Sequence, residues 1–253
     1  MLTARLILIG KLVLLLFLSQ QGFAATVEFS ATAIQTFPQG QSKVAKMNVG
    51  SDGVRREYTH NQRIVVEIYR PSQGMQYLVL PQQKIYEVAK SESVDTGLGK
   101  SRPKSTNPCT GQKGESCKLL GKEKINGRMA DKWEVRRLVQ GKALKALIWV
   151  DVNRGQALRQ FFPDGSSVEL VQTGSEQIGN RNTEKWVIQV TRPDGHTEKT
   201  FQWYDPEIGI IIKEVMPGGF IRELKDIKLG KQAEHIFQVP SDYKKVQSAM
   251  PAN

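Results

Sequence analysis

The stretch that decides the fold is Lys185–Leu224, which reads KWVIQVTRPDGHTEKTFQWYDPEIGIIIKEVMPGGFIREL. Within it, apolar and polar residues alternate in four strand-sized runs: 186–191, 197–203, 210–215 and 220–224. Turn sequences separate the runs, including Pro-Asp-Gly at 193–195 and Pro-Gly-Gly at 217–219. This stretch therefore predicts an antiparallel meander of short strands.

The same unit occurs once more, earlier in the chain. Identical residues recur about 53 residues apart, at turn and aromatic positions: Lys132 and Lys185, Trp133 and Trp186, Trp149 and Trp203, Asp151 and Asp205, Gly155 and Gly209. Further strand-sized runs lie at 64–68, 77–79 and 85–88, with plausible hairpin loops at 70–74 and 81–84. Only 31–37 and 231–235 are compatible with short helical turns.

These patterns predict a mainly β protein of about ten to twelve strands. Because few helices are available to cover its apolar face, such a sheet has to curl over itself. The predicted fold is an antiparallel, incompletely closed (half) β-barrel of meander units with few short helices. Its concave interior is filled either by its own side chains or by a lipid chain.

The first residues have the pattern of a targeting segment. Arg5 and Lys11 precede the apolar run 12–18, and small residues follow it up to Ala24. The run is shorter than the roughly 20 residues of a membrane-spanning helix. We expect residues 1–24 to be a signal peptide, and 25–253 to form a single exported domain that is soluble in the periplasm.

The composition limits the possible partners. The chain has 253 residues, of which 39% are hydrophobic and 24% charged, and this excludes disordered, collagen-like and multispanning membrane proteins. Its formal net charge of +11 favours anionic partners, unless the excess only aids solubility. For an exported protein we expect an anionic membrane surface or an envelope protein rather than nucleic acid.

An insert at about 91–120 concentrates cysteines and positive charge. Export favours a disulfide between Cys109 and Cys117; a redox pair has the wrong spacing, and a zinc site would need two more ligands. The insert is either a solvated loop or a patch for anionic surfaces, in which the contacting residues would be Lys100, Arg102, Lys104, Lys113 and Lys118.

No catalytic pattern is found. His60, His196 and His235 are far apart in sequence and belong to no known catalytic or metal motif. Asp151 and Asp205 precede turns, so we interpret them as turn formers rather than acid–base pairs. The sequence predicts no enzyme, no catalytic residue, no cofactor and no metal.

Three short motifs carry a family resemblance: Tyr69-Arg70-Pro71 through Gly74, Leu78-Val79-Leu80-Pro81 with Tyr86, and the FQVPSDY of 237–243. They resemble the LolA-like superfamily of exported bacterial β-proteins, and more closely its relatives that carry a domain of unknown function. The resemblance implies an unclosed barrel with a hydrophobic cavity, used to carry lipoprotein acyl chains or to sense envelope lipids. The chain differs from the carriers in its lack of evident lid helices and in its Cys-containing insert.

The predicted function is binding, with lipid or lipoprotein acyl chains held in the apolar cavity. The alternative is an envelope sensor or interaction module with a packed barrel and a protein partner. The candidate ligand-binding residues are the aromatic and apolar strand residues Trp133, Ile148, Val150, Trp186, Ile188 and Trp203. The tryptophans among them are also good candidates for core packing.

Overall fold

The computed structural model describes residues 27–90, 106–110, 115–139 and 142–247. The predicted signal peptide and the candidate contact residues Lys100, Arg102, Lys104 and Lys113 lie outside these residues. The chain forms two compact units, and the expectation of a single domain stays a prediction. Unit 1 contains Leu98–Gln177 and Asn182–Trp203, and unit 2 contains Ala25–Gly97, Ile178–Arg181 and Tyr204–Asn253.

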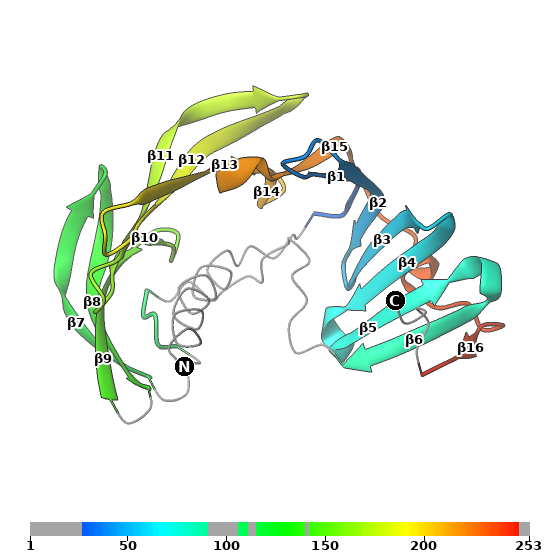
Figure 1. Cartoon of the computed structure of the whole chain (residues 1–253), viewed down its shortest axis with the longest axis horizontal. Coiled ribbons are helices and arrows are strands. Elements are labelled where there is room, and N and C mark those ends of the chain that lie inside the picture. Colours follow the sequence, from blue (N-terminus) through cyan, green and yellow to red (C-terminus); the bar gives the residue numbers. More distant parts are fainter. Residues whose placement is uncertain (1–26, 91–105, 111–114, 140–141, 248–253) are drawn as a thin grey trace, which may run out of the picture. The chain divides into compact units, whose positions relative to one another are not determined.

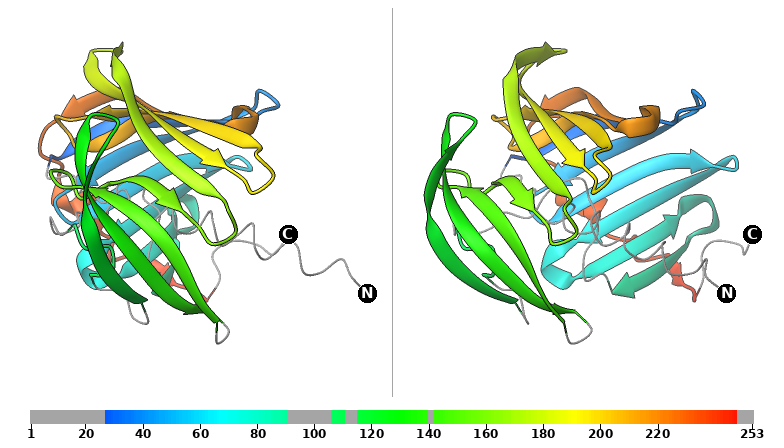
Figure 2. Two further views of the ribbon diagram at one scale, coloured as in Figure 1. Left: turned by 90° about the vertical axis from the view of Figure 1, so that its left-hand side faces the viewer. Right: turned by 60° about the vertical axis from the view of Figure 1, so that its left-hand side comes forward.

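The strands of unit 1 follow one another as a meander (Figures 1 and 2). They are β7 (Glu115–Ile125), β8 (Arg128–Val139), β9 (Lys142–Asp151), β10 (Ala157–Phe161), β11 (Ser167–Ile178), β12 (Arg181–Thr191) and β13 (Thr197–Asp205). The last residues of β11 and β13 and the first of β12 belong to unit 2.

Unit 2 combines both ends of the chain. Its strands are β1 (Phe29–Thr36), β2 (Ser42–Gly50), β3 (Gly53–His60), β4 (Arg63–Arg70), β5 (Met75–Leu80), β6 (Ile85–Lys90), β14 (Ile210–Val215), β15 (Ile221–Leu229) and β16 (Lys244–Lys245). β1 pairs with both β2 and β15, so strands far apart in sequence become neighbours.

The described strands form one sheet in the order β16-β6-β5-β4-β3-β2-β1-β15-β14-β13-β12-β11-β10-β9-β8-β7. Hydrogen bonds do not close this sheet, because β16 and β7 stand at its two ends. The helical elements in the described residues are the short 3₁₀ turns η1 (Pro71–Gln73), η2 (Pro81–Gln83), η3 (Pro217–Gly219) and η4 (Glu234–Phe237). The predicted fold class is thus confirmed, with more strands than expected.

The predicted repeat is also present. The first copy of the four-stranded unit is β8–β11 and the second is β12–β15. The hairpin loops predicted at 70–74 and 81–84 connect β4 to β5 and β5 to β6. Each contains a 3₁₀ turn that begins with proline and ends in a left-handed residue, Gly74 or Lys84.

The two predicted helical turns need correction. Residues 31–37 lie almost entirely in β1, because their short alternating side chains pair on both sides with neighbouring strands, and this pairing outweighs the local helix propensity. The second turn is displaced toward the C-terminus: the 3₁₀ turn η4 spans Glu234–Phe237, where 231–235 was expected.

The C-terminal segment packs against the sheet of unit 2. Phe237 is buried with Val66, Ile68 and Val79 of β4 and β5. Its ring lies against the backbone of Gly50 and Gly53, where any side chain would collide with it. All three motifs that carried the family resemblance contribute to this region. They include Arg70, which donates to the Phe237 carbonyl at 3.4 Å, and Tyr243, which donates to the Pro81 carbonyl at 3.5 Å.

Candidate ligand-binding site

One face of β7–β9 is predominantly apolar. Residues directly opposite each other on paired strands share a face, and Trp133 of β8 is opposite both Leu119 of β7 and Ile148 of β9. The same register fixes the other members. Its apolar members, which we call the apolar face, are Leu119, Trp133, Val135, Leu144, Ala146, Ile148 and Val150. The same side also carries Asp131, opposite Val150, and Arg137, opposite Leu144. Leu119 and Leu144 are 49% and 37% exposed, so its outer part is open in unit 1.

The opposite face of the same strands carries charged side chains, and two of them contact the buried ring of Trp149. Trp149 donates from its indole nitrogen to Glu123 at 2.7 Å, and the Lys132 ammonium lies 4.9 Å from its ring centre. Lys132 also donates to Glu123 at 2.7 Å, and these hydrogen bonds lower the pKa of that carboxyl. Trp149 itself is buried with Ile125, Ala130 and Leu158. Its role is therefore core packing.

The structure divides the six candidate ligand-binding residues. Trp133, Ile148 and Val150 share the apolar face. Trp186 and Ile188 are two apart in β12 and so share one face of that strand. Trp203 lies on the other side, because the ammonium of Lys185, which neighbours Trp186, is 5.0 Å from its ring centre. Trp203 is thus placed like Trp149, its equivalent in the repeat, and both side chains are buried as core residues are.

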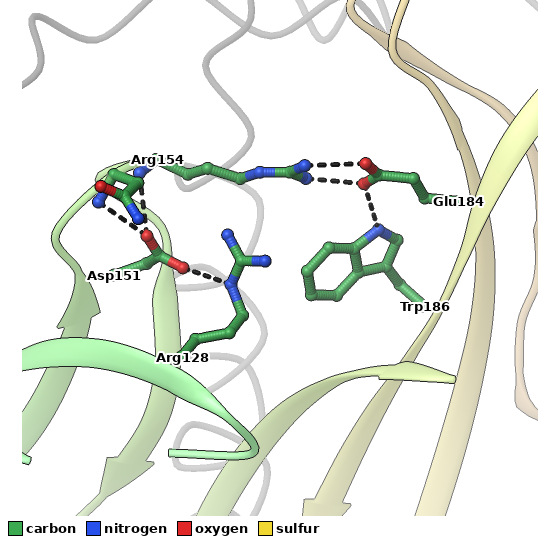
Figure 3. A network of polar contacts seen from close by, with 6 residues as sticks. Arg128, Asp151, Arg154, Glu184 and Trp186 are labelled. Carbon is green, nitrogen blue, oxygen red and sulfur yellow. Dashed lines mark hydrogen bonds and ion pairs between the residues drawn. The ribbon is translucent and has the colours of Figure 1, made fainter. Parts of the chain in front are cut away.

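A polar network surrounds Trp186 (Figure 3). The Asp151 carboxylate, which is 1% exposed, accepts hydrogen bonds from Arg128 Nε and from the backbone of Asn153 and Arg154. Arg154 then reaches Glu184 of β12 with two hydrogen bonds of 2.6 and 2.7 Å. These bonds lower the pKa of the Glu184 carboxyl against the opposing effect of burial.

Glu184 links the network to the aromatic ring. It accepts a hydrogen bond of 3.0 Å from the Trp186 indole nitrogen. The guanidinium carbons of Arg128 and Arg154 are 5.7 and 5.6 Å from the centre of the same ring. One tryptophan of the candidate set therefore has two cationic groups beside it, all within unit 1.

Sequence analysis missed this network, because its partners come from separate hairpins. The available indication was a difference between the repeats: Asn153 and Arg154 stand where the second copy has Glu207 and Ile208. The interpretation of Asp151 and Asp205 as turn formers is confirmed. Asp205 accepts the backbone N–H of Glu207 at 2.9 Å, as Asp151 accepts that of Asn153.

The predicted disulfide between Cys109 and Cys117 is present, and Cys117 lies in β7. Lys118, the one described member of the predicted basic contact set, is exposed on β7.

His60, His196 and His235 lie in β3, in the β12–β13 loop and in η4. Among the described residues, no group of three or more His, Cys, Asp or Glu side chains is placed to hold a metal. In the same part of the chain, no helix has the length and hydrophobicity needed to cross a membrane.

Comparison with known proteins finds similar folds among solved structures. One is the LolA superfamily protein NE2245 from Nitrosomonas europaea, with 13% identity, a TM-score of 0.35 and coverage of 86% of this chain and 92% of that chain. The LolA superfamily is thus among the structural neighbours of this chain.

Two further solved structures show a similarly distant likeness. A domain named for outer membrane lipoprotein sorting, from Vibrio parahaemolyticus, has 14% identity, a TM-score of 0.31 and coverage of 90% and 94%. A DUF1329 family protein from Desulfovibrio piger has 13% identity, a TM-score of 0.30 and coverage of 90% and 96%. No protein-family model and no curated protein matches the chain. Because the TM-scores are low, no ligand or site residue is transferred from these structures.

Proposed function

We propose that this protein is an exported, periplasmic binding protein that holds the acyl chains of a lipid or lipoprotein by passive enclosure. The observation that carries the proposal is the apolar face of β7–β9, whose outer members Leu119 and Leu144 are partly exposed. Each ligand methylene buried there would contribute about 0.8 kcal/mol. A segment of ten methylenes therefore contributes on the order of 8 kcal/mol before the entropy cost of binding.

The predicted export supports this assignment. A disulfide between Cys109 and Cys117 suits an oxidising compartment such as the periplasm, where lipoprotein acyl chains need shelter from water. The signal peptide expected at 1–24 would direct the chain there. The proposed mechanism makes and breaks no bonds and uses no cofactor.

A pair of matched substitutions tests the proposal. Leu144 belongs to the apolar face, and Leu138, which is 71% exposed, is on the opposite face of the same sheet. Leu144→Glu places a charge where the acyl chain would lie, so we expect it to weaken binding of a fluorescent fatty acid by about tenfold or more. Leu138→Glu is expected to leave binding unchanged. Equal affinities for both variants would contradict the proposal.

Extraction of the protein after periplasmic expression gives an independent test. Native mass spectrometry of the full exported chain is expected to show bound lipid, and the amount should fall in Leu144→Glu but not in Leu138→Glu. Repeated absence of lipid would instead favour the alternative function, an envelope sensor or interaction module.

One observation favours this alternative. The β4–β5 face of unit 2 is already covered by the chain itself, through Phe237 and its neighbours Ile236, Val239 and Tyr243. This part of the sheet is packed, as the sensor hypothesis requires. A pull-down with envelope proteins, compared between the wild type and Leu144→Glu, separates the two functions, because a protein partner docking elsewhere would be retained by the variant.

A further inference from the structure

Arg128 has unused hydrogen-bonding capacity. Asp151 accepts its Nε, and among the described residues no acceptor is found for its two terminal amino groups. A guanidinium carries five N–H donors, and four of them belong to these terminal groups. The side chain is 24% exposed, so a ligand can approach it.

The equivalent arginine in the second copy of the repeat, Arg181, has carboxylate partners for its terminal amino groups as well as for Nε. Arg181 donates from Nε and Nη2 to Asp205 at 2.6 and 3.1 Å, and Nη2 also lies 2.8 Å from Glu207. Its side chain is only 10% exposed. The carboxylates of Asp205 and Glu207 raise the pKa of Arg181, chiefly through the hydrogen bonds to Asp205.

Two features make the difference: Asp205 accepts from both Nε and Nη2 of Arg181, where Asp151 accepts only from Nε of Arg128, and the turns differ at one position. Glu207 supplies the second carboxylate in the second copy, and Asn153 occupies the equivalent place in the first. The next residue adds a further positive charge, since Arg154 stands where the second copy has Ile208. Glu184, the nearby carboxylate that could compensate, is already held by Arg154 in a bidentate pair.

We propose that the terminal amino groups of Arg128 bind a phosphate oxyanion. A guanidinium matches two oxygens of such a group in a bidentate pair. The ring of Trp186, which is buried, lies beside both guanidinium groups and helps to hold them in place. The ligand class is a phosphate ester, either a lipid headgroup or a small phosphate in solution.

The oxyanion site is separate from the proposed acyl-chain binding, because Arg128 lies on the face of β8 opposite the apolar face. Asn153→Glu tests the site without removing Arg128. It gives Arg128 a second carboxylate, as Glu207 does for Arg181. In calorimetric titration with inorganic phosphate, we expect Asn153→Glu to weaken binding about tenfold or more. Asn153→Gln is the neutral control and should bind as the wild type does.

The reciprocal change gives a gain of function. Glu207→Asn removes the second carboxylate from Arg181, so this variant should bind a second phosphate. A circular dichroism spectrum of each variant verifies that the sheet is retained. Phosphate binding by Asn153→Glu with wild-type affinity, or no phosphate binding by the wild type, would overturn the oxyanion site.

A second titration separates the two sources of phosphate. If the ligand is a headgroup, the water-soluble lipid dihexanoyl phosphatidylglycerol should bind more tightly than inorganic phosphate. Leu144→Glu should leave the binding of both compounds unchanged, because Leu144 lies on the other face of the sheet from Arg128. Equal affinity for lipid and phosphate would overturn the headgroup assignment while leaving the oxyanion site.

Discussion

The contact between Phe237 and Gly50 predicts that the effect of Gly50→Ala on stability changes sign when the Phe237 ring is removed. A Cβ added at Gly50 would lie 2.6 Å from Cε2 and 2.8 Å from Cζ of the Phe237 ring. Gly50 does not have the positive φ that disfavours other residues, so the collision is the main obstacle to alanine there. We expect Gly50→Ala to destabilise the protein by about 1–3 kcal/mol, as overpacking of a core does.

Removal of the ring should reverse this effect. Phe237→Ala leaves a cavity beside Val66, Ile68 and Val79 and should cost about 3–5 kcal/mol. In that background the Gly50 methyl meets none of the ring atoms that it would otherwise strike. Gly50→Ala should then be neutral or stabilising by about 0.4–1 kcal/mol, because alanine has less freedom than glycine in the unfolded chain.

Urea unfolding of the four proteins in this cycle measures the coupling. Far-UV circular dichroism is the suitable probe, because it follows the strands of both units, whereas all four tryptophans lie in unit 1. We expect a coupling free energy of at least about 1 kcal/mol. The same destabilisation by Gly50→Ala in both backgrounds would show that the ring does not rest on this glycine.

Three further predictions concern unit 1. Asp151→Asn should destabilise the protein by about 1–3 kcal/mol in urea unfolding, because Arg128 loses its charge-assisted hydrogen bond to the buried carboxylate. The exposed turn residue Asp164 is the control and should tolerate Asn within about 1 kcal/mol. Reduction of the Cys109–Cys117 disulfide, which closes a short loop, should cost about 2.5 kcal/mol, and an unchanged unfolding midpoint with and without dithiothreitol would contradict this. The lowered pKa of Glu184 means that its contribution to stability is present above the unfolded-state pKa and is lost as the pH falls through the folded-state pKa. Glu184→Gln should therefore flatten the acid limb of a stability-against-pH curve.

Local patterns were sufficient to predict the meanders. Alternation and turn residues are short-range properties, so the strands from Trp133 to Leu224 and the loops at 70–74 and 81–84 follow from neighbouring residues alone. The roles of Asp151 and Asp205 follow in the same way, since an aspartate before a turn accepts the N–H groups two and three residues later.

Long-range contacts account for most of what was not predicted. Residues 31–37 carry no local sign that they will pair with β15, which is almost two hundred residues away by sequence. The network at Trp186 depends on Arg154 reaching Glu184, 30 residues later. Such pairs depend on the side-by-side arrangement of hairpins, which a single sequence does not encode as a pattern. The division of the candidate tryptophans between two faces depends on register in the same way.

The location of the motifs explains why a family resemblance predicts the fold of this protein better than its ligand. Tyr69-Arg70-Pro71, Leu78–Pro81 and the segment 237–243 all belong to unit 2. There they hold the C-terminal segment to the sheet, through contacts such as Arg70 with the Phe237 carbonyl and Lys84 with Asp242. The apolar face and the Arg128 site belong to unit 1, which contains none of these motifs. Because these motif residues act in unit 2, they do not identify what unit 1 binds, and experiments on Leu144 and Asn153 address that question directly.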